Sequence, residues 1–440
     1  MRLYSPRKEA LLKVLYVLFF LIGGVLTLMS RTSGLSFYSL GQIFGTLSLT
    51  GLTLQLCMGS RIKVLEKGVG LDKILRLHSV NARLTLLFIV LHPTFMFGPA
   101  ILQGESYKTI LASFTFFHWL GIFALLLIIM TILLTIYQNR LKLNYEHWKI
   151  IHKTAYLIIV FGFIHSFFVG PDIATLSPLF YWWIFLAILA ILAILYRYGI
   201  RHWLLRNSLY QIVKIAKESS NVISIYLKPQ RGKIFLFYPG QFAFVKFCSQ
   251  FLSSEEHHFT ISSSPRGNTI CFTIKESGDF TRNLNRLKVG DTAKIEGPFG
   301  AFSNAGMEGP FVFIAGGIGI TPIMSMLSFM KAKRKKEKTL LIYGARKRSD
   351  LIFYEELEKL KKESNWFDAA YILSSEKAPR EERFHKGYIN SNILRSYVPN
   401  FKSAKFFLVG PINMMEAIKK ILIKEKADRG QIFTEKFALK

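Results

Sequence analysis

Long apolar runs dominate the N-terminal half of the chain, and charged residues fall almost entirely between them. Each run is close to the roughly 20 residues that an α-helix needs to cross a lipid bilayer. The pattern therefore predicts a bundle of six transmembrane helices. The predicted spans are Leu11–Met29, Phe37–Met58, Val80–Phe97, Phe114–Tyr137, Ile150–Val169 and Phe180–Tyr198.

Lysine and arginine gather in alternate loops between these spans. Arg61, Lys63 and Lys73 lie between the second and third spans, and Arg140 and Lys142 lie between the fourth and fifth. Loops rich in these residues stay on the cytoplasmic side of a membrane. We therefore expect a multi-pass protein of the cell membrane with both termini in the cytoplasm.

The rest of the chain has the pattern of a soluble protein. Short alternating runs separated by turn residues predict an antiparallel β-barrel over residues 205–303. Strand-like and helix-like runs then alternate over residues 304–440, which predicts an α/β domain with a parallel sheet. The expected fold is a six-helix transmembrane domain over residues 1–204, followed by the β-barrel and the α/β domain.

Composition adds a strong positive charge to this picture. The chain holds 57 Lys and Arg against 28 Asp and Glu, a net charge of +29. Such a charge fits contact with membrane lipids and with phosphate-bearing cofactors. No DNA- or RNA-binding motif accompanies it, so we expect no nucleic-acid partner. Cys57, Cys248 and Cys271 lie far apart and predict neither a disulfide framework nor a thiolate metal site.

Four histidines stand inside the predicted spans, where an unpaired imidazole is costly. His78 and His92 are 14 positions apart in the third span, and His152 and His165 are 13 positions apart in the fifth. Both spans cross the membrane in the same direction, so the histidines form two levels roughly 20 Å apart. Facing imidazoles at two depths predict two haems, each with two axial histidines as iron ligands.

A spacing of 13 residues is not a whole number of helical turns. On an ideal helix it places His152 and His165 on faces that differ by roughly 140°. Aligning them needs a local distortion of the helix, and Gly162 between them is a place where one is permitted. His118 and His147 belong to neither pair and are expected to be structural, with a position near an outer acceptor site as the alternative for His118.

Three short motifs in the soluble half point to nucleotide cofactors. "AGGIGITP", Ala315–Pro322, joins a buried strand to a helix, and its glycines let backbone amides approach a pyrophosphate. "HHFT" at His257–Thr260 and "GDFT" at Gly278–Thr281 come before it. A glycine-rich turn also occurs where a strand and a helix simply pack tightly. The prediction therefore rests on the order and spacing of all three motifs.

The paired histidines and these ordered motifs resemble the ferric reductase/NADPH oxidase superfamily, in which a six-helix haem core precedes a ferredoxin-NADP reductase-like dehydrogenase. The resemblance covers nearly the whole chain. The bacterial NADPH oxidases without regulatory extensions are the most similar members.

This resemblance implies an FAD site on the β-barrel. Phe259 would pack beside the isoalloxazine, the hydroxyl of Thr260 would lie near its reactive nitrogen, and His257 would face its pyrophosphate. His258 stands where the family has a proline. Phe437 matches the terminal aromatic that covers the flavin, and with Thr260 it forms the expected catalytic pair. The other residues expected at FAD are Ile261, Ser262, Gly278, Asp279, Phe280 and Thr281.

The resemblance also implies a nicotinamide nucleotide on the α/β domain. The family's Cys-Gly-Pro segment reads Val409-Gly410-Pro411 here, so Gly410 and Pro411 are kept and the cysteine is missing. The residues expected at the pyrophosphate are Gly316, Gly317, Gly319, Thr321 and Pro322.

Arg346 and Arg348 follow the second strand of the α/β domain, where the adenine ribose is expected. No acidic residue stands beside them in the sequence to bind a free 2′-hydroxyl. We therefore expect NADPH in preference to NADH.

The resemblance implies an NADPH oxidase that passes electrons through FAD and two b-type haems to oxygen outside the cell, forming superoxide. A ferric or cupric metalloreductase needs the same internal path, as does a membrane module that hands electrons to a partner protein. The sequence leaves these alternatives open. The chain carries no EF-hand loop and no long regulatory insertion, so we expect no obligatory regulatory subunit.

Overall fold

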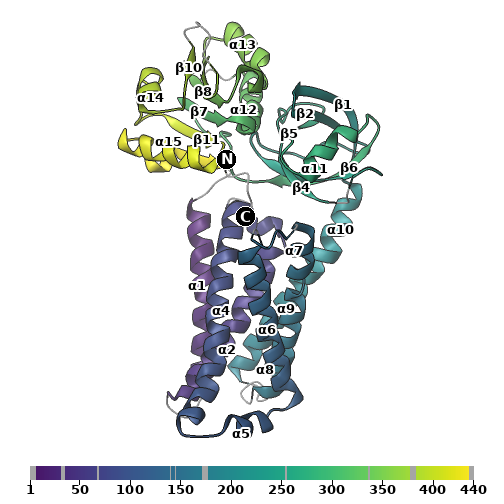
Figure 1. Ribbon diagram of the computed structural model, residues 1–440, viewed down its shortest axis with the longest axis vertical. Coiled ribbons are helices and arrows are strands. Elements are labelled where there is room, and N and C mark those ends of the chain that lie inside the picture. Colours follow the sequence, from purple (N-terminus) through teal and green to yellow (C-terminus); the bar gives the residue numbers. More distant parts are fainter. Residues whose placement is uncertain are drawn as a thin grey trace. The chain divides into compact units, whose positions relative to one another are not determined.

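The computed structural model describes residues 6–30, 35–66, 69–138, 140–143, 145–170, 177–252, 255–334, 337–376 and 383–435. The chain divides into two compact units (Figure 1). Pro6–Leu65 and Lys73–Arg201 form one unit. The other contains Glu66–Asp72 and the described chain from His202 onward.

The first unit is a bundle of long helices, and they lie where the apolar runs predict them (Figure 1). Short elements connect or follow them, namely α3 (Lys63–Glu66), α5 (Tyr107–Ala112), a π-helix over Tyr196–Ile200, α10 (Arg201–Leu204) and a 3₁₀ turn over Leu205–Asn207. The helices of the bundle itself are α1 (Pro6–Met29), α2 (Phe37–Gly59), α4 (Leu71–Leu102), α6 (Phe116–Tyr137), the short α7 (Tyr145–His152), α8 (Ala155–Val169) and α9 (Pro178–Leu195).

Five helical segments among the described residues are long and apolar enough to cross a membrane. They are Arg7–Met29, Leu71–Leu102, Phe116–Tyr137, His147–Val169 and Pro178–Leu204. The predicted span Phe37–Met58 is not among them, although it forms the 23-residue helix α2. The buried positions of α2 are mainly glycine, serine and threonine, which lower its hydropathy. Its polar groups therefore face other helices of the bundle.

Asn81 shows how the bundle satisfies a buried polar side chain. This residue of α4 is fully buried, and its amide nitrogen donates to the carbonyl of Gly51 at 2.8 Å and to the side chain of Gln55 at 2.6 Å. Its oxygen accepts a hydrogen bond from the hydroxyl of Tyr16 at 3.0 Å. Because no water is available inside a membrane, such pairing is required. Asn81 thereby joins α1, α2 and α4.

The second unit begins with the predicted antiparallel sheet. Its strand order is β4-β3-β6-β1-β2-β5, and a bridge between Ile261 and Phe272 links the two edges into a barrel. A short helix, α11 (Asp279–Arg282), and a 3₁₀ turn over Asn283–Arg286 follow β5. The strands are β1 (Leu209–Ser219), β2 (Val222–Pro229), β3 (Phe242–Cys248), β4 (His257–Thr260), β5 (Ile270–Lys275) and β6 (Thr292–Phe299).

The α/β domain has a parallel six-stranded sheet in the order β10-β9-β8-β7-β11-β12. Helices α12 and α13 cover one face and α14 and α15 cover the other (Figure 1). Three 3₁₀ turns lie over Gly317–Gly319, Arg348–Asp350 and Arg429–Gln431. The other elements are β7 (Phe311–Gly316), α12 (Ile320–Ala332), β8 (Thr339–Ala345), α13 (Tyr354–Glu363), β9 (Phe367–Leu373), β10 (Phe384–Lys386), α14 (Ser391–Tyr397), β11 (Lys405–Val409), α15 (Ile412–Lys424) and β12 (Ile432–Glu435).

This strand order contains a topological switch point. The chain moves outward from β7 to β8 and β9 and later returns to place β11 on the other side of β7. Ligands of open α/β sheets bind in the crevice at the carboxyl ends of such strands. The "AGGIGITP" turn follows β7 and Gly410 follows β11, so both motifs lie at this crevice. The predicted fold class is confirmed.

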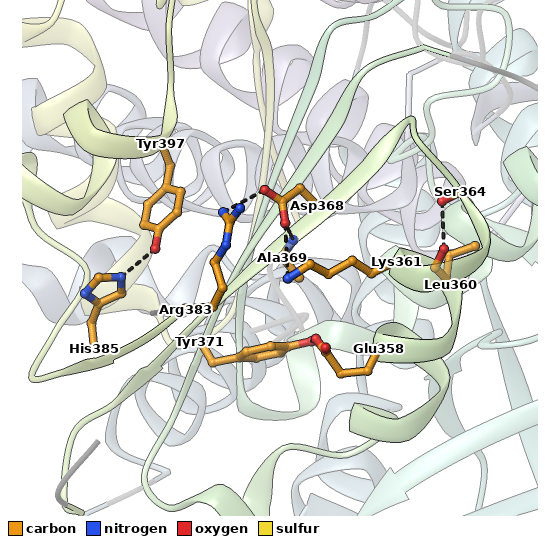
Figure 2. A network of polar contacts seen from close by, with 10 residues as sticks. All are labelled: Glu358, Leu360, Lys361, Ser364, Asp368, Ala369, Tyr371, Arg383, His385 and Tyr397. Carbon is orange, nitrogen blue, oxygen red and sulfur yellow. Dashed lines mark hydrogen bonds and ion pairs between the residues drawn. The ribbon is translucent and has the colours of Figure 1, made fainter. Parts of the chain in front are cut away.

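No pattern in the amino-acid sequence indicates β10, because this edge strand has only three residues. Side-chain contacts fix its position beside β9 (Figure 2). Arg383 pairs with Asp368 of β9 at 2.7 Å. The imidazole of His385 shares a hydrogen bond with the hydroxyl of Tyr397 at 2.7 Å, which joins the strand to α14. The ion pair with Asp368 thereby holds the guanidinium of Arg383 at the edge of the sheet.

Candidate functional site

The four predicted histidines form two facing pairs inside the helical bundle. The ring centroids of His78 and His152 are 6.2 Å apart, and those of His92 and His165 are also 6.2 Å apart. A metal ion bound by two imidazoles lies about 2 Å from each nitrogen. The separation therefore suits one iron between each pair, and it is too wide for direct contact between the rings.

A break in the helical segment that carries His152 and His165, and not a distortion at Gly162, separates these two histidines. Helix α7 ends at His152, and α8 begins at Ala155 after a turn over Lys153 and Thr154. Gly162 lies within the continuous α8, with its nearest neighbours at 3.8 Å. The sequence permits a distortion at Gly162, whereas the irregular turn lies at Lys153 and Thr154, a point that carries no glycine.

Both outer imidazoles are bonded to backbone carbonyls. Nδ1 of His92 lies 2.7 Å from the carbonyl oxygen of Gly41, and Nδ1 of His165 lies 2.9 Å from that of Phe117. A carbonyl only accepts, so each Nδ1 carries the proton and each Nε2 keeps a free lone pair. This tautomer is the one in which Nε2 binds a metal.

The inner imidazoles are held less closely, although the backbone of Gln55 lies near His78. Nδ1 of His78 and Nδ1 of His152 are buried and make no hydrogen bond with any described residue. The indole of Trp148 stacks on His152 at 4.9 Å between ring centroids, and its nitrogen donates to Thr135 at 3.0 Å. Packing therefore holds the imidazole of His152, whereas hydrogen bonds hold the imidazoles of His92 and His165.

Glycines beside the imidazoles are the part of this site that the sequence prediction missed. A β-carbon at Gly45 would lie 3.0 Å from Nδ1 of His92, and one at Gly121 would lie 2.6 Å from Nδ1 of His165. Gly59 faces His78 at 3.6 Å. A signal was present in the sequence, because Gly45 and Gly59 have the same 14-residue spacing as the histidines they face.

His118 has a local structural contact. Its Nδ1 accepts from the backbone N–H of Thr115 at 3.2 Å and lies 2.9 Å from the Thr115 hydroxyl, at the start of α6. Its ring centroid is 6.3 Å from that of His165. The imidazole thus caps the first turn of α6.

The flavin motifs meet at a cavity of about 200 Å³ in the second unit. Phe259 and Thr260 line it, with Thr281 of the "GDFT" motif and Thr321 of the glycine-rich turn. This volume is below the roughly 300–1,000 Å³ of whole-ligand pockets, so it suits one ring system of a larger dinucleotide. The other lining residues are Phe242, His258, Thr273, Ile274, Lys275, Ser277, Ile318 and Glu435.

Other residues of the flavin motifs lie beside the cavity. The ring of His257 stacks on Phe280 at 3.8 Å between centroids, and its Nε2 lies 2.8 Å from the carboxylate of Glu255. The hydroxyl of Thr281 accepts from the backbone N–H of Gly278 at 3.0 Å, which holds the loop before Asp279. Ring stacking therefore connects the first two motifs.

Ile261 and Ser262 belong to the barrel core and do not line the cavity. The hydroxyl of Ser262 donates to the carbonyl of Cys271 at 3.0 Å. Burial raises the pKa of the Cys271 thiol above its ordinary value. The thiol therefore stays protonated at neutral pH.

The glycine-rich turn has the close backbone approach that its sequence predicts. Gly317 adopts φ +54°, a left-handed conformation that glycine favours, and its carbonyl accepts from the Tyr343 hydroxyl at 3.2 Å. A β-carbon at Gly319 would lie 2.5 Å from the carbonyl oxygen of Val409. Pro322 lies in the first turn of α12. Two separate loops, the turn after β7 and the one after β11, therefore touch through backbone atoms.

Gly316, Gly410 and Pro411 meet at the same place. A β-carbon at Gly316 would lie 2.7 Å from the sulfur of Met414 and 2.9 Å from Pro411. Met414 also packs against Gly410. The sequence prediction missed this thioether, which lies beside the position of the missing cysteine.

The surroundings of Arg346 and Arg348 are not free of acidic groups. The backbone N–H of Arg348 donates to the carboxylate of Glu376 at 2.8 Å, and Asp350 accepts from the N–H of Lys347 at 3.2 Å. The expectation that no acidic residue stands here was wrong, because Glu376 arrives from the end of β9. The guanidinium of Arg348 packs over the ring of Phe384 at 5.1 Å.

Phe437 lies outside the described residues.

Comparisons with known families match the chain in three consecutive parts. Residues 44–163 match the ferric reductase like transmembrane component. Residues 208–315 match an FAD-binding domain, and residues 313–420 match an oxidoreductase NAD-binding domain.

Curated relatives cover part of the chain. The chain is 28% identical over 242 residues to the glycine betaine monooxygenase reductase subunit of Pseudomonas aeruginosa, which covers 53% of this chain and 65% of that protein. It is 27% identical over 248 residues to a flavohemoprotein of Halalkalibacterium halodurans, covering 52% and 59%. The chain thus spans less than two thirds of either relative.

Among solved structures, flavohemoglobin from Malassezia yamatoensis aligns with a TM-score of 0.50 and 17% identity, covering 92% of this chain and 100% of that one. A likeness at this identity shows the fold alone.

The apolar helices and the two nucleotide-binding domains define a membrane oxidoreductase with FAD- and NAD(P)-binding domains. The order of the three matched parts is the ferric reductase/NADPH oxidase architecture, and this chain has it.

Substituting Gly319→Ala tests the contact between the two loops. The added β-carbon would meet the backbone of Val409 at 2.5 Å, so the turn has to move. We expect a loss of roughly 1–3 kcal/mol in the free energy of unfolding, as for an overpacked core. The KM for the nicotinamide nucleotide should also rise, measured by ferricyanide reduction.

Gly430→Ala is the matched control, because the nearest atom to its added β-carbon is 3.5 Å away. If both variants keep the same KM and the same thermal unfolding midpoint, the two loops do not form one site.

Proposed function

We propose that this protein is an NADPH oxidase, which carries electrons from cytoplasmic NADPH through FAD and two haems to oxygen across the membrane and forms superoxide. One observation carries the proposal. Two imidazole pairs, each 6.2 Å between ring centroids, lie in the same chain as the flavin and nicotinamide motifs. A path for single electrons across a bilayer needs both parts.

When bound, FAD accepts a hydride from the nicotinamide and releases single electrons, which the haems carry. His78 and His152 would hold the inner iron, and His92 and His165 would hold the outer iron. With both outer imidazoles engaged as iron ligands, an external acceptor would receive its electron without binding the metal.

Residues of the second unit position the nucleotides. The hydroxyls of Thr260, Thr281 and Thr321 line one cavity, where they donate to or accept from a flavin ring system. The backbone of the turn at Gly317 binds the pyrophosphate of the nicotinamide nucleotide. These domains would lie on the cytoplasmic side, a proposal supported by the lysine- and arginine-rich loops between the helices.

A metalloreductase is the second candidate, because the helical unit matches a family described by its likeness to ferric reductases. A module that serves a partner protein is the third. Two matched relatives are described as a reductase subunit and an electron transfer component, the latter from Burkholderia cepacia.

The acceptor is tested with the purified full chain in lipid nanodiscs, given FAD, haem and NADPH. We expect reduction of a superoxide probe that superoxide dismutase abolishes, because oxygen takes one electron at a time. Ferric chelate reduction that dismutase leaves unchanged supports the metalloreductase instead. NADPH consumption only after a cell extract is added supports the partner module.

Substitution of the histidines tests the ligand assignment. His92→Ala removes one ligand of the outer pair, so we expect loss of one low-spin haem signal and of superoxide formation. Ferricyanide reduction by NADPH should persist, because it draws on the flavin. His147→Ala is the control, since this exposed histidine of α7 belongs to neither pair. Retention of both low-spin signals in His92→Ala contradicts the assignment.

Arg346→Ala tests the choice of nucleotide. Arg346 is exposed at the end of β8, where a 2′-phosphate would gain a charge-assisted hydrogen bond. We expect the KM for NADPH to rise roughly tenfold, in line with the about 1.5 kcal/mol of such a bond. The KM for NADH should stay unchanged. Lys419→Ala, an exposed lysine of α15, is the control. Equal changes for both nucleotides count against a 2′-phosphate site.

A further inference from the structure

The last long helix of the bundle ends in an irregular turn. After α9, residues Tyr196–Ile200 form a π-helix, in which the backbone N–H of Arg201 donates to the carbonyl of Tyr196. Such turns are rare, and they often occur at functional sites. This one contains Arg197 and Tyr198, whose contacts lead to the two inner histidines.

Arg197 connects the π-turn to His78 through the end of α2. Its guanidinium donates to the carbonyl of Gly59 at 2.9 Å. Gly59 is the last residue of α2, and a β-carbon there would lie 3.6 Å from Cε1 of His78. The half-buried guanidinium therefore binds the residue that faces this imidazole.

Tyr198 connects the same turn to the other inner histidine. Its ring meets the ring of Tyr156 edge to face, with 5.5 Å between the centroids. Tyr156 lies at the start of α8, four residues after His152. The π-turn is therefore in contact with a neighbour of each inner imidazole, one from α2 and the other from α8.

The simplest role for Arg197 is to cap α2. The last carbonyls of an α-helix have no partner within the helix, and an arginine can bind one of them. However, Arg197 lies inside Pro178–Leu204, a segment apolar enough to cross a membrane, where an arginine is costly and marks a functional site. A guanidinium has five N–H donors, so it can bind a helix carbonyl and a carboxylate at once.

Haem would bring carboxylates to this place. It carries two propionate groups, and a carboxylate among apolar helices needs a cationic or hydrogen-bonding partner. Arg83 is near His78 in the sequence, but its side chain is exposed and donates to the hydroxyl of Ser79 at 3.2 Å. Arg197 is half-buried and reaches the inner level from inside the bundle.

We propose that Arg197 binds a propionate carboxylate of the inner haem while it holds the carbonyl of Gly59. The interaction is an ion pair with charge-assisted hydrogen bonds, and no covalent bond changes. Tyr198 is a positioning residue, because its contact with Tyr156 holds the π-turn against α8. This rests on the proposed function, since it requires a haem at the inner pair of histidines.

The assignment gives α9 a part in the inner site, although this helix contains no histidine. The imidazoles of α4 and α7 would hold the iron, and the turn after α9 would hold the edge of the porphyrin. A residue that binds the propionate fixes the rotation of the ring about the axis through the two imidazoles. Iron ligands alone leave this rotation open.

The test follows the inner haem by itself in the purified full chain. His92→Ala removes an outer ligand, so the low-spin haem that remains is the inner one. In this background, Arg197→Ala should release haem to a scavenging apoprotein roughly tenfold faster, as the loss of one charge-assisted hydrogen bond predicts. The resonance Raman band of the propionate bend should also shift, because it responds to hydrogen bonding of the carboxylate. In a His78→Ala background, which keeps only the outer haem, Arg197→Ala should change neither.

Arg197→Gln separates carboxylate binding from helix capping. Its amide can still donate to the carbonyl of Gly59 but carries no charge, so it should give the same faster release and band shift. This variant decides the matter if Arg197→Ala does not fold. Arg83→Ala, the exposed arginine of α4, is the matched control and should behave as the parent does.

The inference is overturned if Arg197→Gln keeps the inner haem with the release rate and the propionate band of the parent. It is also overturned if the two changes appear equally in the His78→Ala background. A parent chain that binds no low-spin haem would instead reject the proposed function.

Discussion

The helical unit is built around one constraint, which is that imidazoles on different helices face each other in pairs among apolar side chains. The ring centroids of each pair are 6.2 Å apart, at two levels of the bundle. A long α4 carries one member of each pair on one face. The partner segment is broken between α7 and α8, since a continuous helix would turn His152 away from the line of His165.

The same constraint accounts for the composition of α2. The second nitrogen of each outer imidazole has a backbone carbonyl as its acceptor, and a glycine four residues after that carbonyl lies against the ring. Gly41 and Gly45 provide these two positions for His92, and Gly51 lets Asn81 reach a carbonyl. The many small residues of α2 lower its hydropathy, so it is not among the segments apolar enough to cross a membrane, although it lies within the bundle.

The second unit uses glycine for a related purpose. At the switch point of the parallel sheet, the turns after β7 and β11 approach each other through backbone atoms, with Gly319 against Val409. Beside this contact, the threonines of three motifs face one cavity. Glycines at a turn between a strand and a helix let the phosphate groups of a ligand approach the backbone amides. In both units, therefore, the absence of a side chain exposes the polar groups on which the proposed function depends.

The sequence by itself determined the helical spans, the antiparallel and parallel sheets, and the choice of His78, His92, His152 and His165, because apolar periodicity and residue spacing are local properties. It also determined the motifs that line the flavin cavity. Only the tertiary structure decided the break at Lys153–Thr154, the glycines beside the outer imidazoles and the approach of Glu376 to Arg348. Each of these depends on a neighbour from a distant part of the chain, and local spacing carries no information about which helix or strand that neighbour comes from.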